Sequence, residues 1–330
     1  MSIVFKDFKV QTDDEGKRLD VVLRRLCPEL PLSAIYRLLR HSLIRLNGKK
    51  AQPNLRLHTG DTISLKADIP IKSINRIKGH HPKALWLKKI LVFESPAILA
   101  FNKPRGLTAH GPGSLTELLW QSDLVKINTS LSFRPGPIHR LDRNTSGLII
   151  FGRNIDGARQ ATALFKQHAV LKIYLGLVAG YLKDEAYWED LISRDFKRRI
   201  SFKASPQTNP PDSRLAQTKV IPLAHSQGQS CVLFCPLTGR THQLRLQACL
   251  HGYPLLGDPK YNPKGHQSKS SYLLHCYTLA PLKKLAVFPP LKAPLDREDE
   301  IRLSLLFGKE ILSLIEKKVN ELYSSAILFT

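Results

Sequence analysis

The 330-residue sequence has no uninterrupted apolar run of about 18 residues, the length that a membrane-spanning helix requires. Charges at Lys6, Asp7 and Lys9 stand where a secretory signal would need its apolar core. We therefore expect no membrane partner and a cytoplasmic location.

Motifs for metals and nucleotide cofactors are missing as well. The five cysteines are an odd set without C-x-x-C spacing, which disfavours a disulfide framework and a zinc site. There is no H-E-x-x-H, no G-x-x-x-x-G-K-[ST] and no G-x-G-x-x-G. We expect neither a metal nor a cofactor.

Acidic residues are scarce. The chain has 27 Asp and Glu against 50 Lys and Arg, a formal net charge of +23. Self-repulsion of this size opposes compaction unless a polyanion uses the charge, so nucleic acid or an anionic membrane surface would fit. The alternative is a basic surface that serves only solubility.

The first 76 residues are typical of a small basic domain. Apolar residues at helical spacing predict a helix over residues 19–26 and a second one from Ser33. A strand then leads into Asn47-Gly48, a pair suited to a tight hairpin turn, and a short strand follows over 62–65. Ten Lys and Arg lie between Gly16 and Arg56: Lys17, Arg18, Arg24, Arg25, Arg37, Arg40, Arg45, Lys49, Lys50 and Arg56.

This order, with R-L-D-x-x-L, S-x-x-x-R-x-L-L, I-R-L-N-G and L-x-x-G-D, resembles the RNA-binding domain first recognised in ribosomal small-subunit protein S-four. On that resemblance Arg37, Arg40 and Lys49 would contact RNA backbone. The alternative is a basic helical cap packed on a larger domain.

The rest of the chain predicts an α+β domain with a mixed, largely antiparallel sheet. Residues 77–89 continue a basic stretch without acids and are interpreted as a solvated linker. Strand-like apolar runs then recur at 98–101, 148–151, 173–178 and 232–234, with a helix over 158–168 and a closing helix over 309–323. We therefore predict an S-four-like domain over 1–76, the linker over 77–89 and a catalytic domain over 90–330.

Asp142 is the first candidate for chemistry. It lies between two arginines in His139-Arg140-Leu141-Asp142-Arg143-Asn144-Thr145-Ser146-Gly147-Leu148, which predicts a tight polar turn before an apolar strand. Positive neighbours stabilise a charged carboxylate, which suits a nucleophile or an electrostatic stabiliser better than a general acid. An ordinary ion-paired loop is the alternative.

A second cluster, Thr238-Gly239-Arg240-Thr241-His242-Gln243-Leu244-Arg245, precedes Gly257-Asp258. Its two arginines, Arg240 and Arg245, can bind phosphate or pair with Asp142 through a planar fork. Alternatively they neutralise local acids such as Asp258. The absence of a second carboxylate beside Asp142 disfavours glycosidase chemistry.

Four motifs in order resemble the RluA family of RNA pseudouridine synthases. They are N-K-P-R-G at 102–106, H-R-L-D-R-N-T-S-G-L at 139–148, K-I-Y-L-G-L-V-A-G at 172–180 and G-R-T-H-Q-L-R at 239–245 with G-Y-P-L-L-G-D at 252–258. The sequence departs from the family at Gln247, where a histidine is usual.

The resemblance implies roles for four residues. Asp142 would be the nucleophile, and Arg245 would hold and aim it by a two-pronged contact. Tyr174 would stack on the uracil and assist the final proton removal; without the family, a core strand residue is the simpler interpretation. Arg140 would fill the place of the flipped base or clamp a phosphate. Apart from the resemblance, Arg240 can bind phosphate and is expected to contact RNA.

We therefore expect an enzyme that isomerises uridine in RNA, with large-subunit ribosomal RNA favoured. No DNA partner and no obligate protein partner is implied. A synthase for transfer RNA would share the same catalytic residues, and a non-catalytic RNA-binding or assembly protein is the alternative of another class. A retired enzyme would have no physical reason to keep Asp142, Tyr174 and Arg245 together.

Overall fold

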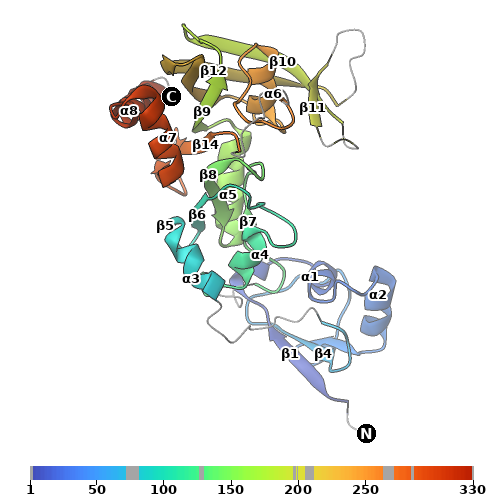
Figure 1. The fold of residues 1–330 in the computed structure, drawn as a ribbon. Helices are drawn as coiled ribbons and strands as arrows, with labels where there is room; N and C mark the ends of the chain where they lie inside the picture. Colours follow the sequence, from blue (N-terminus) through green and yellow to red (C-terminus); the bar gives the residue numbers. More distant parts are fainter. Residues whose placement is uncertain are drawn as a thin grey trace.

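The computed structural model describes residues 3–71, 82–125, 130–195, 198, 200–204, 212–262, 271–283 and 286–328. Figure 1 shows two lobes, a small one that contains the N-terminus and a larger one built around a long twisted sheet. Among the described residues, no helix is long and apolar enough to cross a membrane.

The small lobe contains a four-stranded antiparallel sheet in the order β1-β4-β2-β3. Asn47 and Gly48 turn the hairpin with φ of 51° and 75°, the left-handed conformation that their sequence predicted. The two predicted helices are confirmed, and their apolar faces form the core of the lobe. The elements are β1 (Phe5–Lys9), α1 (Leu19–Leu26), α2 (Leu32–Arg40), β2 (Ile44–Leu46), β3 (Lys49–Lys50) and β4 (Thr62–Lys66), with a 3-10 turn at Thr12–Asp14.

The large lobe has an eleven-stranded sheet with the main order β11-β10-β12-β13-β9-β14-β8-β6-β5. Its pairs are antiparallel except for β14 with β8, so the predicted α+β class with a mixed, largely antiparallel sheet is confirmed. The strands are β5 (Leu91–Glu94), β6 (Ile98–Lys103), β7 (Gly136–Pro137), β8 (Ser146–Gly152), β9 (Val170–Ala179), β10 (Ala186–Asp195), β11 (Ile200–Lys203), β12 (Arg214–Ser226), β13 (Gln229–Pro236), β14 (Leu274–Pro281) and β15 (Leu291–Lys292). The helices are α3 (Pro82–Lys89), α4 (Leu115–Trp120), α5 (Ile155–Lys166), α6 (Gln243–Leu250), α7 (Arg297–Phe307) and α8 (Ile311–Leu328).

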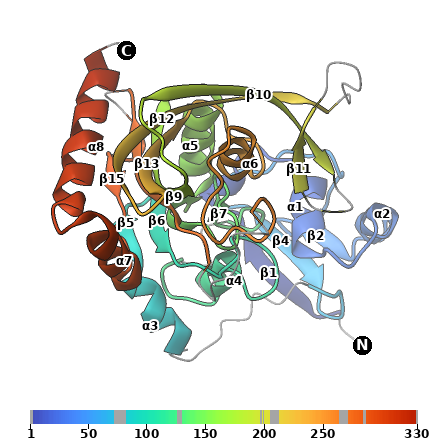
Figure 2. The same cartoon turned by 45° about the horizontal axis from the view of Figure 1, so that its top comes forward.

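Alternation along β9 separates the two faces of the sheet. Ile173, Leu175 and Leu177 share a core with α7 and α8, whereas Tyr174 and Val178 belong to the opposite cluster, which includes residues of α6. Figure 2 shows α7 and α8 together beside the sheet and α6 apart from these two helices. The alternation places Tyr174 on the same side as α6.

Part of the predicted linker differs from the expectation. Residues 82–89 form α3, and Leu87 is fully buried in the core of the large lobe. Burial of this leucine makes the helix part of that lobe, so a solvated linker was wrong for these residues. The remaining linker residues, 77–81, lie outside the described residues.

The carboxylate of Asp14 joins the two lobes. It accepts hydrogen bonds from the Ser130 hydroxyl at 2.7 Å, the Leu131 amide at 2.6 Å and the Ser132 hydroxyl at 2.6 Å. Burial alone would raise the pKa of Asp14, but these hydrogen bonds and the charge of Lys17 hold the pKa below its usual value. The contact is therefore made by an ionised, satisfied carboxylate.

Candidate active site

Asp142 lies in the turn between β7 and β8, as the sequence predicted. The Thr145 amide donates to the Asp142 carbonyl at 3.1 Å and closes the turn before the buried strand begins. The strand is anchored where β8 runs parallel to β14, with Ser146 hydrogen-bonded to His275 Nδ1 at 2.9 Å. Asp142 therefore lies in a closed turn that leads directly into a paired strand of the sheet.

Gly147 is required for this anchoring. Its φ is +103°, and a Cβ there would lie 2.3 Å from the carbonyl oxygen of Cys276. A side chain at this position would overlap the backbone of β14, which cannot move aside. Only glycine therefore allows β8 to pair with β14 directly after the turn that carries Asp142.

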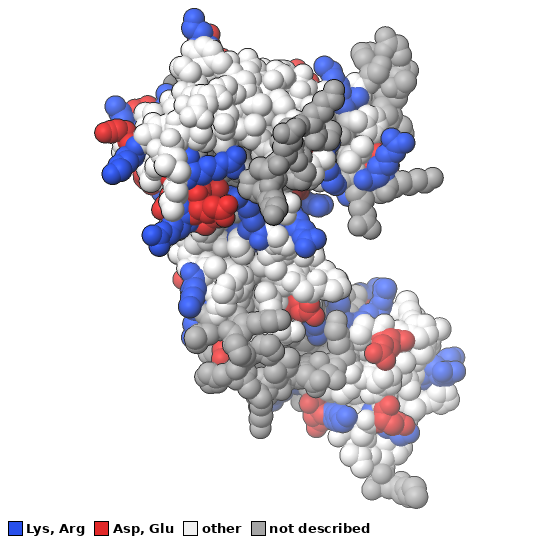
Figure 3. All heavy atoms as spheres, viewed as in Figure 1, with Lys and Arg blue, Asp and Glu red and all other residues white. Residues whose placement is uncertain are grey.

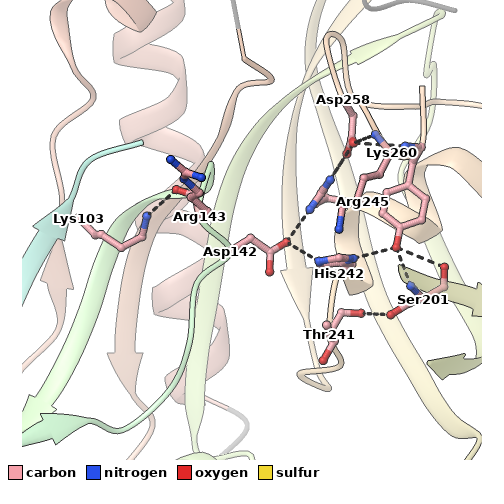
Figure 4. A network of polar contacts seen from close by, with 10 residues as sticks. Lys103, Asp142, Arg143, Ser201, Thr241, His242, Arg245, Asp258 and Lys260 are labelled. Carbon is pink, nitrogen blue, oxygen red and sulfur yellow. Dashed lines mark hydrogen bonds and ion pairs between the residues drawn. The ribbon is translucent and has the colours of Figure 1, made fainter. Parts of the chain in front are cut away.

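Lys103, at the end of β6, ties a second loop to the nucleophile turn. Its ammonium donates to the carbonyls of Pro104, Leu107 and Arg143 at 3.0, 2.9 and 3.2 Å, and its side chain is fully buried (Figure 4). Burial lowers the pKa of Lys103 to about 8, opposed by the charge of Asp142. Three acceptors match the three protons of an ammonium, so Lys103 fixes the backbone next to Asp142 as a cation.

Arg245 connects two carboxylates. Its Nε and Nη2 atoms donate to Asp258 at 2.7 and 2.8 Å, and Nη1 donates to Asp142 Oδ2 at 3.0 Å (Figure 4). The predicted two-pronged contact was therefore wrong in its target, because the fork grips Asp258 and a single N–H reaches Asp142. The interpretations left open, pairing with Asp142 and neutralising Asp258, both hold.

The charge of Arg245 is secured by this arrangement. Burial alone would lower its pKa, but the hydrogen bonds to Asp258 and the nearby acids raise the pKa above its usual value. The same bonds hold the pKa of Asp258 below its usual value in spite of its burial. Asp142 thus faces a permanent cation.

His242 occupies the other side of the same carboxylate oxygen. Its Nε2 lies 3.8 Å from Asp142 Oδ2, and its Nδ1 lies 2.9 Å from the hydroxyl of Tyr261. Burial and the charges of Arg245 and Lys260 lower the pKa of His242, against the opposing pull of Asp142 and Asp258. The imidazole is therefore neutral at pH 7.

Tyr174 lies on β9 directly across from Cys276 of β14. Burial raises its pKa well above 10, with further contributions from Cys276 and Asp142. The phenol is therefore protonated at neutral pH in the free enzyme. Its aromatic ring remains available for stacking.

A pocket of about 540 Å³ brings the predicted residues together. Asp142, Tyr174 and Arg245 line it with Arg140 and Arg240. Arg140 is exposed, and its guanidinium makes no hydrogen bond to the residues that the structure describes. Arg240 is exposed as well, and its Nε donates to the Leu215 carbonyl at 2.9 Å.

The other predicted RNA contacts lie in the small lobe, outside this pocket. Arg37, Arg40 and Lys49 are exposed on α2 and β3. Four of the ten predicted cations have internal partners instead. Lys17 binds Asp14 and Ser132, and Arg18 binds Asp20. Arg45 and Arg56 donate to the carbonyls of Ser42 and Gly16. Lys and Arg gather around the notch between the lobes on the face seen in Figure 3.

Gln247 replaces the usual histidine without leaving polar groups unpaired. Its Oε1 accepts from the Thr218 hydroxyl at 2.6 Å, and its Nε2 donates to Asp190 Oδ2 at 3.0 Å. Further contacts reach the carbonyls of Trp188 and Ala216, each at 3.2 Å. Gln247 thus joins α6 to β10 and β12, away from the pocket lining.

The sequence interpretation missed three contributors to the site: Lys103, His242 and Tyr261. Lys103 ends an apolar strand inside N-K-P-R-G, and a lysine beginning a Pro-Gly loop was the available signal. His242 lies inside G-R-T-H-Q-L-R, but only its φ of 54° and its distance to Asp142 show its place. Tyr261 follows G-Y-P-L-L-G-D by three residues, but nothing in that spacing predicts its contact with His242.

Comparisons with known proteins agree with this geometry. The RNA pseudouridylate synthase family model matches residues 97–249, and the S4 domain model matches residues 17–63. A ribosomal large subunit pseudouridine synthase C from Rickettsia bellii is 34% identical over 280 residues, covering 82% of this chain and 91% of that protein. The protein of the same name from Vibrio cholerae is 26% identical and covers 87% and 94%.

A solved structure has the same fold. The human RNA pseudouridylate synthase domain containing 4 superposes with a TM-score of 0.54 at 22% identity, covering 67% of this chain and 94% of that one. Together, the sheet, the pocket with Asp142 and the sequence relatives define an RNA-modifying isomerase of the pseudouridine synthase class. The chain belongs to the RNA pseudouridylate synthase family and carries an S4 domain at its N-terminal side.

Proposed function

We propose that this enzyme isomerises specific uridines in large-subunit ribosomal RNA, with Asp142 as nucleophile. The observation that carries the catalytic part is the environment of Asp142 in the pocket: Arg245 and His242 both face Oδ2, at 3.0 and 3.8 Å. Among the described residues, none hydrogen bonds to Oδ1. One oxygen is thus held while the other is available for attack.

The reaction requires few protein groups. The bond from N1 of uracil to C1′ of ribose breaks, the base turns, C1′ joins C5, and a proton leaves C5 while N1 gains one. No net oxidation or hydrolysis takes place. A carboxylate held by a cation is therefore sufficient for the covalent step. The atom that it attacks is either in the base or C1′ of the ribose.

The target uridine must leave its stack to enter a pocket of this kind. Extrusion costs a few kcal/mol, and an aromatic face such as that of Tyr174 can bind the flipped base. Arg140 is exposed at the pocket, and its guanidinium makes no hydrogen bond to the described residues, so it is available to stack in the vacated place or to hold a phosphate. Arg240 would add a phosphate contact at the same opening.

The chain is divided into an RNA-binding part and a catalytic part. We propose that residues 1–76 form the RNA-binding domain and that the catalytic domain includes α3, so that it begins near residue 82. Arg37, Arg40 and Lys49 would contact RNA backbone outside the active site. An enzyme acting on ribosomal RNA works in the cytoplasm, which is the location that we propose.

The choice of RNA rests on the relatives, whose names specify the large ribosomal subunit. The test is incubation of the purified protein with large-subunit ribosomal RNA and with bulk transfer RNA, both lacking modifications, followed by pseudouridine mapping. We expect pseudouridine at a few sites of the ribosomal RNA. Modification confined to transfer RNA would contradict this substrate and identify the protein as a synthase for transfer RNA.

The RNA-binding role of residues 1–76 has its own test. Their deletion should weaken affinity for a structured ribosomal fragment and flatten the slope of log K against log salt, by about one unit for each lost phosphate contact. Single-turnover rates at saturating RNA should change little. Unchanged affinity and slope in a folded truncated protein would leave the basic lobe as a structural cap.

A further inference from the structure

The pocket lining carries more positive charge than its acids neutralise. Five Lys and Arg of the described chain line it: Arg140, Lys166, Lys172, Arg240 and Arg245. Asp142 is the one acid among the described lining residues, and it pairs with Arg245, as Asp258 does. The other four cations form no ion pair with a carboxylate in the part of the chain that the structure describes. Their charge is therefore left for an anion that enters with the substrate.

Lys172 is the half-buried member of these four cations. Its ammonium donates to the Leu237 carbonyl at 3.5 Å and to no other described residue. Lys103, which is fully buried, instead gives its three protons to three carbonyl oxygens. Burial lowers the pKa of Lys172, and the groups that most oppose this are two thiols rather than a carboxylate. Two protons of the Lys172 ammonium thus have no acceptor among the described residues.

We propose that Lys172 binds a backbone phosphate that adjoins the flipped uridine. The proposal rests on the proposed function and adds a substrate contact to it. Burying a cation costs free energy unless an anion or several acceptors compensate it. A phosphate brings both the negative charge and the acceptor oxygens, and lysine binds phosphate as a point charge.

Strand β9 sets the distance between Lys172 and the ring that would hold the base. Lys172 and Tyr174 are two residues apart on the same face of β9, and both line the pocket. At the rise of a strand, their Cα atoms are about 6.6 Å apart. A phosphate of a nucleotide lies at a comparable distance from its base. A uridine whose base contacts Tyr174 therefore has a phosphate within reach of Lys172.

The residues beside Lys172 mark the open side of the pocket. The Leu237 carbonyl that it contacts also lies 2.7 Å from Nδ1 of His168, and both Leu237 and His168 are exposed. Only 16% of the Asp142 side chain and 6% of the Arg245 side chain are exposed, so the nucleophile lies deeper. The base must reach Asp142, whereas the sugar-phosphate backbone stays connected to the rest of the RNA at the open side.

A second source of negative charge is the base itself. If uracil leaves C1′ with the bonding electrons, its carbonyl oxygens become negative, and a cation at the base would stabilise them. Such a contact would raise the rate of conversion, whereas a phosphate contact stabilises the bound RNA before any bond breaks. The open position of Lys172 favours the phosphate, and separate measurements of affinity and rate distinguish the two.

The test uses the full chain and an RNA fragment with a uridine that pseudouridine mapping shows to be converted. In two further fragments, an uncharged methylphosphonate replaces the phosphodiester on the 5′ or the 3′ side of that uridine. We expect one of these replacements to weaken binding about 10-fold, the effect of losing one charge-assisted hydrogen bond. Unchanged binding of both fragments would overturn the proposal without any alteration of the protein.

Lys172→Gln removes the charge and keeps a polar side chain. It should weaken binding of the natural fragment about 10-fold and reduce the slope of log K against log salt by about one unit. The sensitive methylphosphonate fragment should bind this variant about as weakly as it binds the unaltered enzyme, because one contact cannot be lost twice. Lys172→Arg, which keeps the charge, should retain most of the affinity.

Lys317→Gln is the matched control, because Lys317 is exposed on α8, which packs on the face of the sheet opposite to Tyr174. Its affinity and salt slope should equal those of the unaltered enzyme. Additive losses from Lys172→Gln and from the methylphosphonate would overturn the phosphate contact. Full affinity with a slower rate at saturating RNA would assign Lys172 to the base instead. Absence of pseudouridine from the unaltered enzyme would contradict the proposed function rather than this contact.

Discussion

A lysine could not reproduce the hydrogen bonds that Arg245 makes with its planar guanidinium. Three N–H groups point in fixed directions, two to Asp258 and one to Asp142. A lysine keeps the charge but offers no planar fork, so the aim of Asp142 is lost. Loss of one charge-assisted hydrogen bond corresponds to about 1.5–3 kcal/mol.

We therefore expect Arg245→Lys to lower the single-turnover rate by roughly 10- to 100-fold, the rate equivalent of that energy. RNA affinity should stay within a few fold, because the side chain of Arg245 is buried and bonded to Asp258 and Asp142. Rapid-quench kinetics with a filter-binding control measure both. A full rate in the variant would remove Arg245 from the account.

At this scale the sequence predicted which side chains meet, but not how they divide their contacts. Asp142, Tyr174 and Arg245 line one pocket, as the motifs indicated. The sequence could not show whether the fork of Arg245 faces Asp142 or Asp258. Asp142 lies 103 residues away along the chain, and Asp258 lies 13 residues away, beyond the end of α6. Only the packing of α6 against the sheet decides this.

At the scale of elements, continuous apolar runs predicted the strands, since a strand that is covered on both faces of a sheet reads as such a run. Helix α6 was not predicted, because its polar residues alternate with apolar ones, so the apolar residues do not recur at helical spacing. Strand β1 was missed for the opposite reason: its sequence FKDFK is mostly exposed and pairs only at the edge of the small sheet.

Asp14 should control how the two lobes are held together. Replacing it with alanine removes the acceptor for Ser130, Leu131 and Ser132 and leaves Lys17 without its partner. We expect a larger radius of gyration by small-angle scattering and faster proteolysis between the lobes. Asp7→Ala, an exposed acid of the same lobe, is the control and should leave both unchanged. Identical scattering for the two variants would show that other contacts fix the lobes.

At the scale of the whole molecule, buried neutral histidines make stability depend on pH. Burial lowers the pKa of His139 to about 3 and the pKa values of His242 and His275 to about 4. In the unfolded chain a histidine titrates near 6.5, so below that pH the unfolded state binds more protons and folding loses free energy. The loss continues until the folded groups titrate.

Urea unfolding should therefore give a free energy that falls as pH drops from about 6.5 toward 4. Each of the three histidines contributes a slope of roughly 1.4 kcal/mol per pH unit. His275→Gln should reduce the slope, whereas His41→Gln, at an exposed position, should not. A free energy that is constant between pH 7 and 5 would contradict the buried neutral state of these side chains.

The excess of positive charge predicted a polyanion partner, and the family match to RNA-modifying enzymes agrees with it. The arrangement of the cations could not be predicted. Lys17, Arg18 and Arg45 serve internal contacts, so the cations available for RNA are fewer than the sequence suggested. Composition counts charges, whereas the fold decides which of them face the solvent.

The central claim is that Asp142 forms the covalent bond to the substrate. The most direct measurement is pseudouridine formation by Asp142→Asn under single-turnover conditions, with RNA affinity measured in parallel. We predict no detectable pseudouridine and an affinity within about tenfold of that of the unaltered enzyme, since the phosphate-contacting surface is intact. Measurable turnover by the folded variant would contradict the account.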